Sequence, residues 1–281
     1  MKKSKVSGVD IIVWALLVVM LIFTVTPLIF MFSASMMQKN QILRMPYSWI
    51  PRPFYPHNFY QALRGNDGSW IFPRNMLNSL IVSSIVACTT VIFASLTGYG
   101  LAQFRFKGRT LVFMMIMATM MIPFEAIMIP LYMVARGLNI QNTYVGLILP
   151  FALSAFGVFQ MRQYLTTFPV EFLDAARVDG LSEAGIFWKI VFPNCTPAIA
   201  TLAILSFRGQ WDNLLWPLLV IQSEKMKTIP LYISKFSEEK MTDEGAMMAV
   251  AAIASIPMFI LFFSLSRYFI SGAAVYDSRK G

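Results

Sequence analysis

Histidine, cysteine and charged residues are all scarce in this sequence. Its 281 residues include one histidine, His57, and two cysteines, Cys88 and Cys195. No metal-ligating residue accompanies either cysteine, which excludes a zinc site, a Cys/His nucleophile pair and a disulfide framework. Only 13% of the residues are charged, about half of the roughly 25% usual in a soluble domain. With 57% hydrophobic residues, 24 Phe and 20 Met, the composition indicates a protein that lies in a lipid bilayer.

The net charge of +9 is distributed in a way that argues against nucleic-acid binding. Lys and Arg form no basic face or run, and lie instead in short clusters between apolar stretches, as membrane topology requires. The sequence contains no glycine-rich phosphate-binding loop ending in Lys and Ser or Thr, so the chain is not expected to hydrolyse ATP itself. It also contains no nucleophile–base pair or metal-ligand cluster that would favour a membrane enzyme.

Six apolar runs are long enough to cross a membrane as helices. They are Ile11–Phe32, Ser79–Leu101, Leu111–Met133, Tyr144–Met161, Ala198–Ile221 and Ala246–Ile270. The first run precedes Ser33-Ala34-Ser35, which is similar to a signal-peptide cleavage site. Its roughly 22 residues, about 33 Å as a helix, exceed a signal-peptide core and match a bilayer core of about 30 Å. We therefore predict an uncleaved membrane helix.

Proline within these runs predicts kinked helices packed in a bundle, since neighbouring helices or water can satisfy the carbonyls that proline frees. The residues are Pro27, Pro123, Pro130, Pro217 and Pro257. We find no tandem repeat and no low-complexity segment, and therefore predict one membrane domain over residues 1–281.

Lys and Arg near the ends of the spans predict that both termini are cytoplasmic. The residues on the predicted cytoplasmic side are Lys2, Lys3, Lys5, Arg105, Lys107, Arg109, Arg162, Arg177, Lys189, Arg279 and Lys280. The connection between the third and fourth spans has only Arg136. Residues 33–78 are then external, and their aromatic residues either dock a partner or form an interfacial belt. These are Trp49, Phe54, Tyr55 and Trp70.

A predicted cytoplasmic segment, residues 166–193, contains two short helices joined at a sharp corner, which we call the elbow (residues 168–193). Pro169 suits the start of the first helix, and Gly180 suits its end, where a positive φ is needed. A larger residue at Gly180 is expected to crowd the corner. Ser182 is placed to cap the second helix, which Pro193 is expected to end.

The elbow also carries apolar and ionic patterns of its own. Asp174 and Arg177 have the i,i+3 spacing of an ion pair on one helix face. The second helix presents an apolar stripe made of Ile186, Phe187, Ile190 and Val191. Two interpretations remain open on physical grounds: the elbow either fits a groove of a partner protein, or packs as an interfacial helix on its own bundle.

The sequence from Asp174 to Gly180 (DAARVDG), with Phe187 and Pro193, resembles the coupling-helix (EAA) motif of ABC importer permeases. In that family the segment docks into a cleft of the ATP-hydrolysing subunit and transmits its closure to the pore. Asp174 stands where the family usually has Glu, which keeps the charge. The resemblance implies that ATPase coupling involves Glu171, Asp174, Ala175, Ala176, Arg177, Asp179, Gly180, Phe187 and Pro193.

Nearly the whole chain shares this resemblance, through residues 74–79, 121–125, 130–132, 211–213 and 216–218. It is similar to the second permease subunit of maltose- and glycerol-phosphate-type systems. The expected fold is an all-α membrane protein with six transmembrane helices and a cytoplasmic coupling elbow. The resemblance implies a location in the inner membrane of a bacterium. It also implies a second permease subunit, two ATPase subunits that bind ATP and Mg, an external solute-binding protein and a carbohydrate substrate. This chain itself is expected to hold no cofactor.

Charged residues inside the spans are costly and mark paired or functional positions. Glu125 and Asp212 are each about 14 residues from the inner end of their run, so straight helices would place both at a depth of about 21 Å. Arg208 and Asp212 have the i,i+4 spacing of a structural ion pair. The alternative is a sugar path whose carboxylates accept hydroxyl hydrogen bonds and whose indoles stack on sugar rings. Its candidates are Glu125, Trp211, Asp212, Asn213 and Trp216.

A different class of function is a stand-alone secondary transporter driven by an ion gradient. Such carriers usually show inverted internal repeats and more spans, and neither is found here. The elbow favours the permease subunit of an ATP-driven importer.

Overall fold

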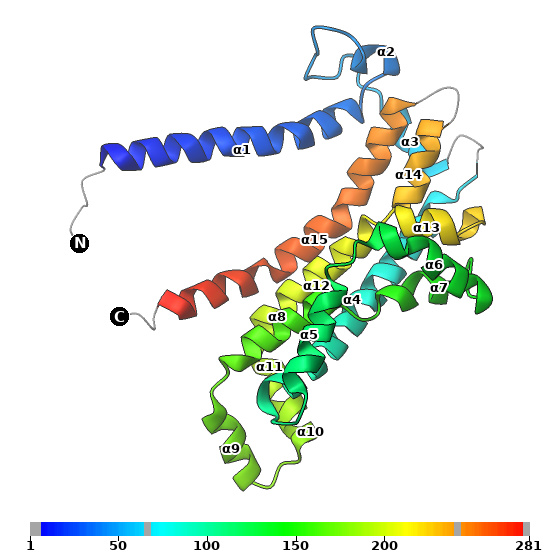
Figure 1. Cartoon of the computed structure of the whole chain (residues 1–281). Coiled ribbons are helices and arrows are strands. Elements are labelled where there is room, and N and C mark those ends of the chain that lie inside the picture. Colours follow the sequence, from blue (N-terminus) through cyan, green and yellow to red (C-terminus); the bar gives the residue numbers. More distant parts are fainter. Residues whose placement is uncertain (1–6, 65–68, 239–242, 278–281) are drawn as a thin grey trace. The chain divides into compact units, whose positions relative to one another are not determined.

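The computed structural model describes residues 7–64, 69–238 and 243–277, and this part of the chain is helical, without a strand (Figure 1). The elements are α1 (Gly8–Ala34), α2 (Lys39–Ile42), α3 (His57–Arg64), α4 (Phe72–Gln103), α5 (Arg109–Thr119), α6 (Phe124–Gly137), α7 (Tyr144–Ile148), η1 (Leu149–Phe151), α8 (Ala155–Thr166), α9 (Val170–Val178), α10 (Glu183–Ile186), η2 (Phe187–Val191), α11 (Phe192–Asn194), α12 (Thr196–Trp211), α13 (Leu215–Val220), η3 (Glu224–Met226), α14 (Ile229–Glu238) and α15 (Glu244–Asp277). Of the residues used to predict orientation, five lie outside the described ranges: Lys2, Lys3, Lys5, Arg279 and Lys280.

Three described helices, α1, α4 and the Glu244–Tyr268 part of α15, are long and apolar enough to cross a membrane unbroken. By length and composition alone, three bent pairs raise the number of candidate spans to as many as six, if each pair is one span. The pairs are Arg109–Thr119 with Phe124–Gly137, Tyr144–Phe151 with Ala155–Thr166, and Glu183–Asn194 with Thr196–Trp211. The predicted all-α membrane fold is confirmed, and Pro27 and Pro257 lie inside unbroken helices.

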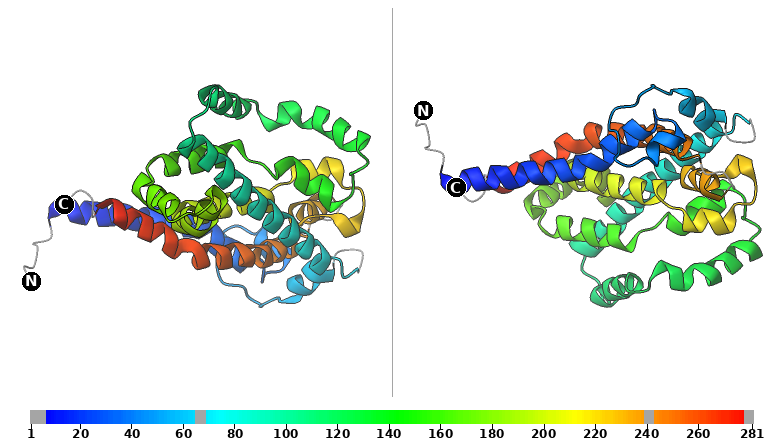
Figure 2. Two further views of the ribbon diagram at one scale, coloured as in Figure 1. Left: turned by 90° about the horizontal axis from the view of Figure 1, so that it is seen from below. Right: turned by 90° about the horizontal axis from the view of Figure 1, so that it is seen from above.

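The predicted third span, Leu111–Met133, is not one straight helix. Its two halves, α5 and α6, meet at an angle of 95° (Figure 2). Pro123 precedes α6 in an extended conformation, with φ of −63° and ψ of 138°, and this conformation ends the helical path. The bend removes the basis for placing Glu125 at the same depth as Asp212, because that estimate requires a straight helix.

The predicted fifth span, Ala198–Ile221, also divides, because α12 ends at Trp211 and α13 begins at Leu215. Pro217 lacks the N–H that a continuous helix would donate to the carbonyl of Asn213. The side chain of Asn213 instead accepts the backbone N–H of Trp216 at 3.3 Å and so starts α13. Here proline breaks the helix, whereas the prediction assumed that a membrane helix would tolerate it.

The chain divides into two compact units, residues 1–72 with 233–256, and residues 73–232 with 257–281. In the first unit the buried side chain of Asn58 donates to the carbonyls of Ser35 at 3.0 Å and Met37 at 2.7 Å. These bonds tie α3 to the segment that follows α1. The aromatic residues that were predicted to be external are largely exposed: Trp49, Phe54 and Trp70 are at least half exposed.

The second unit contains two apolar cores, both of which include residues of α4. One gathers residues of α4, α8, the elbow and α12, and the other surrounds the fully buried Trp216 of α13. Close packing holds α4 against α8, since a Cβ at Gly98 would lie 2.8 Å from the Cβ of Met161. Gln160 of α8 donates to the carbonyl of Ala198 in α12 at 3.2 Å. The elbow is therefore attached to a packed group of three helices.

Candidate functional site

The corner between α9 and α10 is a Schellman motif. After α9 ends at Val178, Gly180 has a φ of +81°, which confirms the predicted left-handed conformation. The N–H of Gly180 donates to the carbonyl of Arg177, and the N–H of Leu181 donates to the carbonyl of Ala176, both at 3.0 Å. A Cβ at Gly180 would meet no atom within 4 Å, so the expectation that a larger residue crowds this corner is wrong for the chain by itself. Only backbone strain opposes substitution.

The second helix of the elbow begins as predicted and ends differently. Ser182 caps it, since its Oγ accepts the N–H of Gly185 at 3.2 Å. Pro193 was expected to end this helix, but the helix continues through the π turn η2 and α11 to Asn194. The wider π turn moves the carbonyl of Lys189 away from the proline ring, whose clash with that carbonyl would end a regular α-helix.

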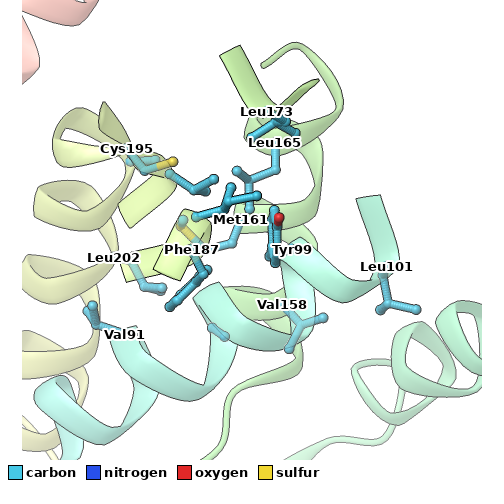
Figure 3. Close-up of a cluster of buried hydrophobic side chains, with 14 of the residues drawn as sticks. Val91, Tyr99, Leu101, Val158, Met161, Leu165, Leu173, Phe187, Cys195 and Leu202 are labelled. Carbon is cyan, nitrogen blue, oxygen red and sulfur yellow. The ribbon is translucent and has the colours of Figure 1, made fainter. Parts of the chain in front are cut away.

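One face of the elbow is buried against its own helices. Leu173 is 1% and Phe187 is 2% exposed, and Ala176 is also buried. Figure 3 shows Leu173 and Phe187 in one cluster with Met161 of α8 and Tyr99 of α4. The rings of Phe187 and Tyr99 have centroids 5.5 Å apart. The interpretation that the elbow packs on its own bundle therefore holds for this face.

The opposite face of the elbow is exposed. Phe172 is 62% and Val178 is 88% exposed, and Val170 is also exposed. The carboxylates of Glu171 and Asp179 stand among these apolar groups and are exposed too. Ala175 lies on the same exposed side, next in sequence to buried Ala176. An exposed apolar surface of this kind is typical of a protein-binding site, so this face fits the alternative interpretation, in which the elbow binds in a groove of a partner protein.

An ionic network joins the two helices of the elbow to each other and to α4. The predicted pair of Asp174 and Arg177 is confirmed, with Nη1 of Arg177 2.8 Å from Oδ1 of Asp174. Nε of Arg177 donates to Oε1 of Glu183 at 2.8 Å, across the glycine corner. The hydroxyl of Tyr99 donates to Oε2 of Glu183 at 3.0 Å. One carboxylate thus receives hydrogen bonds from two different helices.

This network fixes geometry more than it adds stability. Its ion-pair side chains are more than a third exposed, so each pair contributes only about 0–1 kcal/mol. The hydrogen bond from Arg177 holds the pKa of the Glu183 carboxyl below its usual range, so Glu183 is ionised at neutral pH. Sequence reasoning missed Glu183 and Tyr99. The only signal for Glu183 was its place in the first turn after the Ser182 cap, where an acidic residue complements the helix dipole.

The candidate sugar-path residues differ in exposure in the described structure. Trp211 is 4% exposed and stacks on Phe207, with ring centroids 5.5 Å apart, while fully buried Trp216 donates its indole N–H to the carbonyl of Gly146 at 2.9 Å. Both indoles are therefore covered by this chain. Asp212 is exposed and accepts from Nε of Arg208 at 3.3 Å, as the structural interpretation predicts.

The other two candidates lie at helix ends. Asn213 follows α12 and donates from Nδ2 to Oε1 of Gln210 at 3.3 Å. Glu125 is exposed in the first turn of α6. In the described part of the chain no hydrogen bond or ion pair links Glu125 to Asp212. Both carboxylates remain accessible to a solute.

Comparison with known proteins supports the permease resemblance. Residues 90–274 match the family described as "Binding-protein-dependent transport system inner membrane component". The arabinooligosaccharides transport system permease protein AraQ of Bacillus subtilis is 37% identical over 209 residues, 74% of each chain. The lactose transport system permease protein LacG of Rhizobium radiobacter is 33% identical over 267 residues, 94% of each chain. The sn-glycerol-3-phosphate transport system permease protein UgpE of Yersinia pestis is 31% identical over 278 residues, 97% of this chain and 98% of UgpE.

The fold has a solved counterpart as well. A crystal structure of a bacterial ABC transporter, involved in the import of the acidic polysaccharide alginate, superposes with a TM-score of 0.82. That match covers 96% of this chain and 99% of the other, at 23% identity. The family match and the relatives named above define the class of this protein as a membrane component of an ABC importer. Specifically, the chain belongs to the binding-protein-dependent transport system inner membrane component family. This assignment supports a permease subunit and does not support a stand-alone secondary transporter.

Proposed function

We propose that this chain forms one half of the membrane pore of an ATP-driven importer and that the elbow couples the pore to a separate ATPase. The observation that carries the proposal is the two-sided elbow. On its inner face, Leu173 and Phe187 are buried against the helix bundle, and on its outer face Phe172 and Val178 are exposed. Such an element can transmit the movement of a partner that binds the outer face.

The proposed partners follow from this arrangement and from the family. A second related permease completes the pore, two ATPase subunits bind ATP and Mg, and an external solute-binding protein delivers the solute. The elbow and both termini lie on the cytoplasmic side. Described basic residues at the predicted inner side include Arg105 and Lys107, between α4 and α5, and Arg109, which begins α5.

The proposed substrate is a carbohydrate or a related solute. The relatives named above are described as permeases for arabinooligosaccharides, lactose and sn-glycerol-3-phosphate, all of which carry hydroxyl groups. In this chain the exposed groups that can accept hydroxyl hydrogen bonds are the carboxylates of Asp212 and Glu125, and Asn213 follows Asp212 in the sequence. Trp211 and Trp216 would form the packed wall of the proposed path, because their rings are covered in this structure.

The experiment is purification of the complex in lipid nanodiscs, followed by ATPase measurements with a panel of sugars and the cognate binding protein. The ATPase is expected to co-purify with this subunit, and one class of sugar is expected to stimulate hydrolysis when the binding protein is present. An ATPase that does not associate with this subunit under any solute condition would contradict the proposal.

A further inference from the structure

Glu183 joins three helices through its two carboxylate oxygens. Oε2 accepts from the hydroxyl of Tyr99, near the end of α4, at 3.0 Å. Oε1 accepts from Nε of Arg177 in α9 at 2.8 Å, while Glu183 itself begins α10. Apolar packing is not directional, so the contact between Phe187 and Tyr99 holds the elbow near α4 without fixing its orientation. The hydrogen bonds of Glu183 supply that orientation.

The helix to which Glu183 is fastened differs from the bent pairs. α4 is continuous over Phe72–Gln103, whereas the three bent pairs turn by 95°, 43° and 79° at their breaks. When one end of a bent pair is displaced, the backbone at the break can change its angle and take up the movement. A continuous helix moves as one body, so a displacement of one end also moves the other end. There, Asn78 of α4 donates to the carbonyls of Lys225 and Lys227, both at 2.9 Å, and accepts the hydroxyl of Tyr144 at 2.6 Å. α4 is therefore tied by polar side chains at both ends.

We infer that Glu183 is a positioning residue that fastens the coupling elbow to α4, so that α4 carries a displacement of the elbow to the 222–229 segment at its far end. The inference rests on the proposed function, in which a bound ATPase moves the elbow. It adds a residue outside the recognised coupling pattern and names the helix through which the movement leaves the elbow.

The first test measures the fastening without requiring transport. Tyr99→Phe removes one hydroxyl and keeps the ring between Phe104 and Phe187. Glu183→Gln removes the charge at nearly constant volume. The matched control is Tyr164→Phe, which removes a hydroxyl that donates to the carbonyl of Asn194, the residue just after the elbow, at the longer distance of 3.4 Å. Backbone amide hydrogen exchange of residues 175–181, in the purified subunit in nanodiscs, is expected to rise about fivefold in both test variants and to stay unchanged in the control.

The second test measures coupling in the complete complex. Both test variants are expected to bind the ATPase at the normal ratio and to import about fivefold fewer solute molecules per ATP hydrolysed. The double variant is expected to be no worse than Glu183→Gln alone, because both substitutions break one chain of contacts. Unchanged exchange, an unchanged import ratio or loss of ATPase binding would each overturn the inference. If the unaltered complex imports nothing, the proposed function fails, and amide exchange still decides whether Glu183 fastens the elbow.

Discussion

Substitution of Gly180 separates the role of the elbow corner from ordinary backbone strain. Gly180 has a φ of +81°, and a Cβ there would meet nothing within 4 Å. Gly180→Ala therefore carries only the cost of a left-handed non-glycine residue, about 1–2 kcal/mol. That cost lowers the equilibrium ratio of molecules with the intact corner to molecules without it by roughly 5- to 30-fold. Gly180→Asp adds to the strain a charge on the exposed face, close to Asp179.

Gly108 provides a matched control within the same chain. It has a φ of +86° and equally open surroundings, but it lies before α5 and outside the elbow. The assay is co-purification of the ATPase together with uptake of the transported solute. Gly180→Asp is expected to lose ATPase binding or uptake, Gly180→Ala to lose part of it, and Gly108→Ala to retain both. If Gly180→Asp retains full uptake and stoichiometric ATPase, the elbow is not the coupling element and the reasoning is refuted.

Three further predictions concern topology, the solute path and packing. A cysteine that replaces exposed Trp70 is expected to react with a membrane-impermeant thiol reagent only when the reagent is added outside the cell. A cysteine that replaces exposed Val178 is expected to react only from the cytoplasmic side, and the reverse pattern would contradict the predicted orientation. Asp212→Asn is expected to lower uptake several-fold without changing ATPase co-purification, and uptake equal to that of the unaltered protein would remove Asp212 from the path. Gly98→Ala is expected to lower the thermal unfolding temperature, by overpacking that costs about 1–3 kcal/mol, because its Cβ would press on α8. Gly100→Ala, with nothing within 4 Å, is expected to leave stability unchanged or raise it, and equal effects of the two substitutions would contradict the packing argument.

The features that were predictable from sequence depend on local rules. A glycine after an apolar helix, a serine two residues further on and an i,i+3 charge pair are sufficient to predict the corner at Gly180, the Ser182 cap and the contact of Asp174 with Arg177. Apolar length is sufficient to locate the membrane helices. Each of these signals lies within a few residues of the structure that it produces.

The features that escaped prediction depend on contacts between distant residues or on how a proline is accommodated. Tyr99 and Glu183 are 84 positions apart, and no local pattern brings them together. Pro257 stays within a continuous helix, whereas Pro123 and Pro217 accompany breaks, so a proline in an apolar run does not by itself decide whether the helix continues. The burial of the Trp216 indole required knowledge that it bonds to Gly146.

The source of energy for transport tests the central claim most directly. The complete complex is reconstituted in proteoliposomes, with ATP and Mg on the ATPase side and the solute-loaded binding protein on the other side. Solute uptake is then measured in the presence of ionophores that collapse every ion gradient. We predict uptake that requires ATP hydrolysis and persists without an ion gradient. Uptake that follows an imposed ion gradient in the absence of ATP would contradict the account.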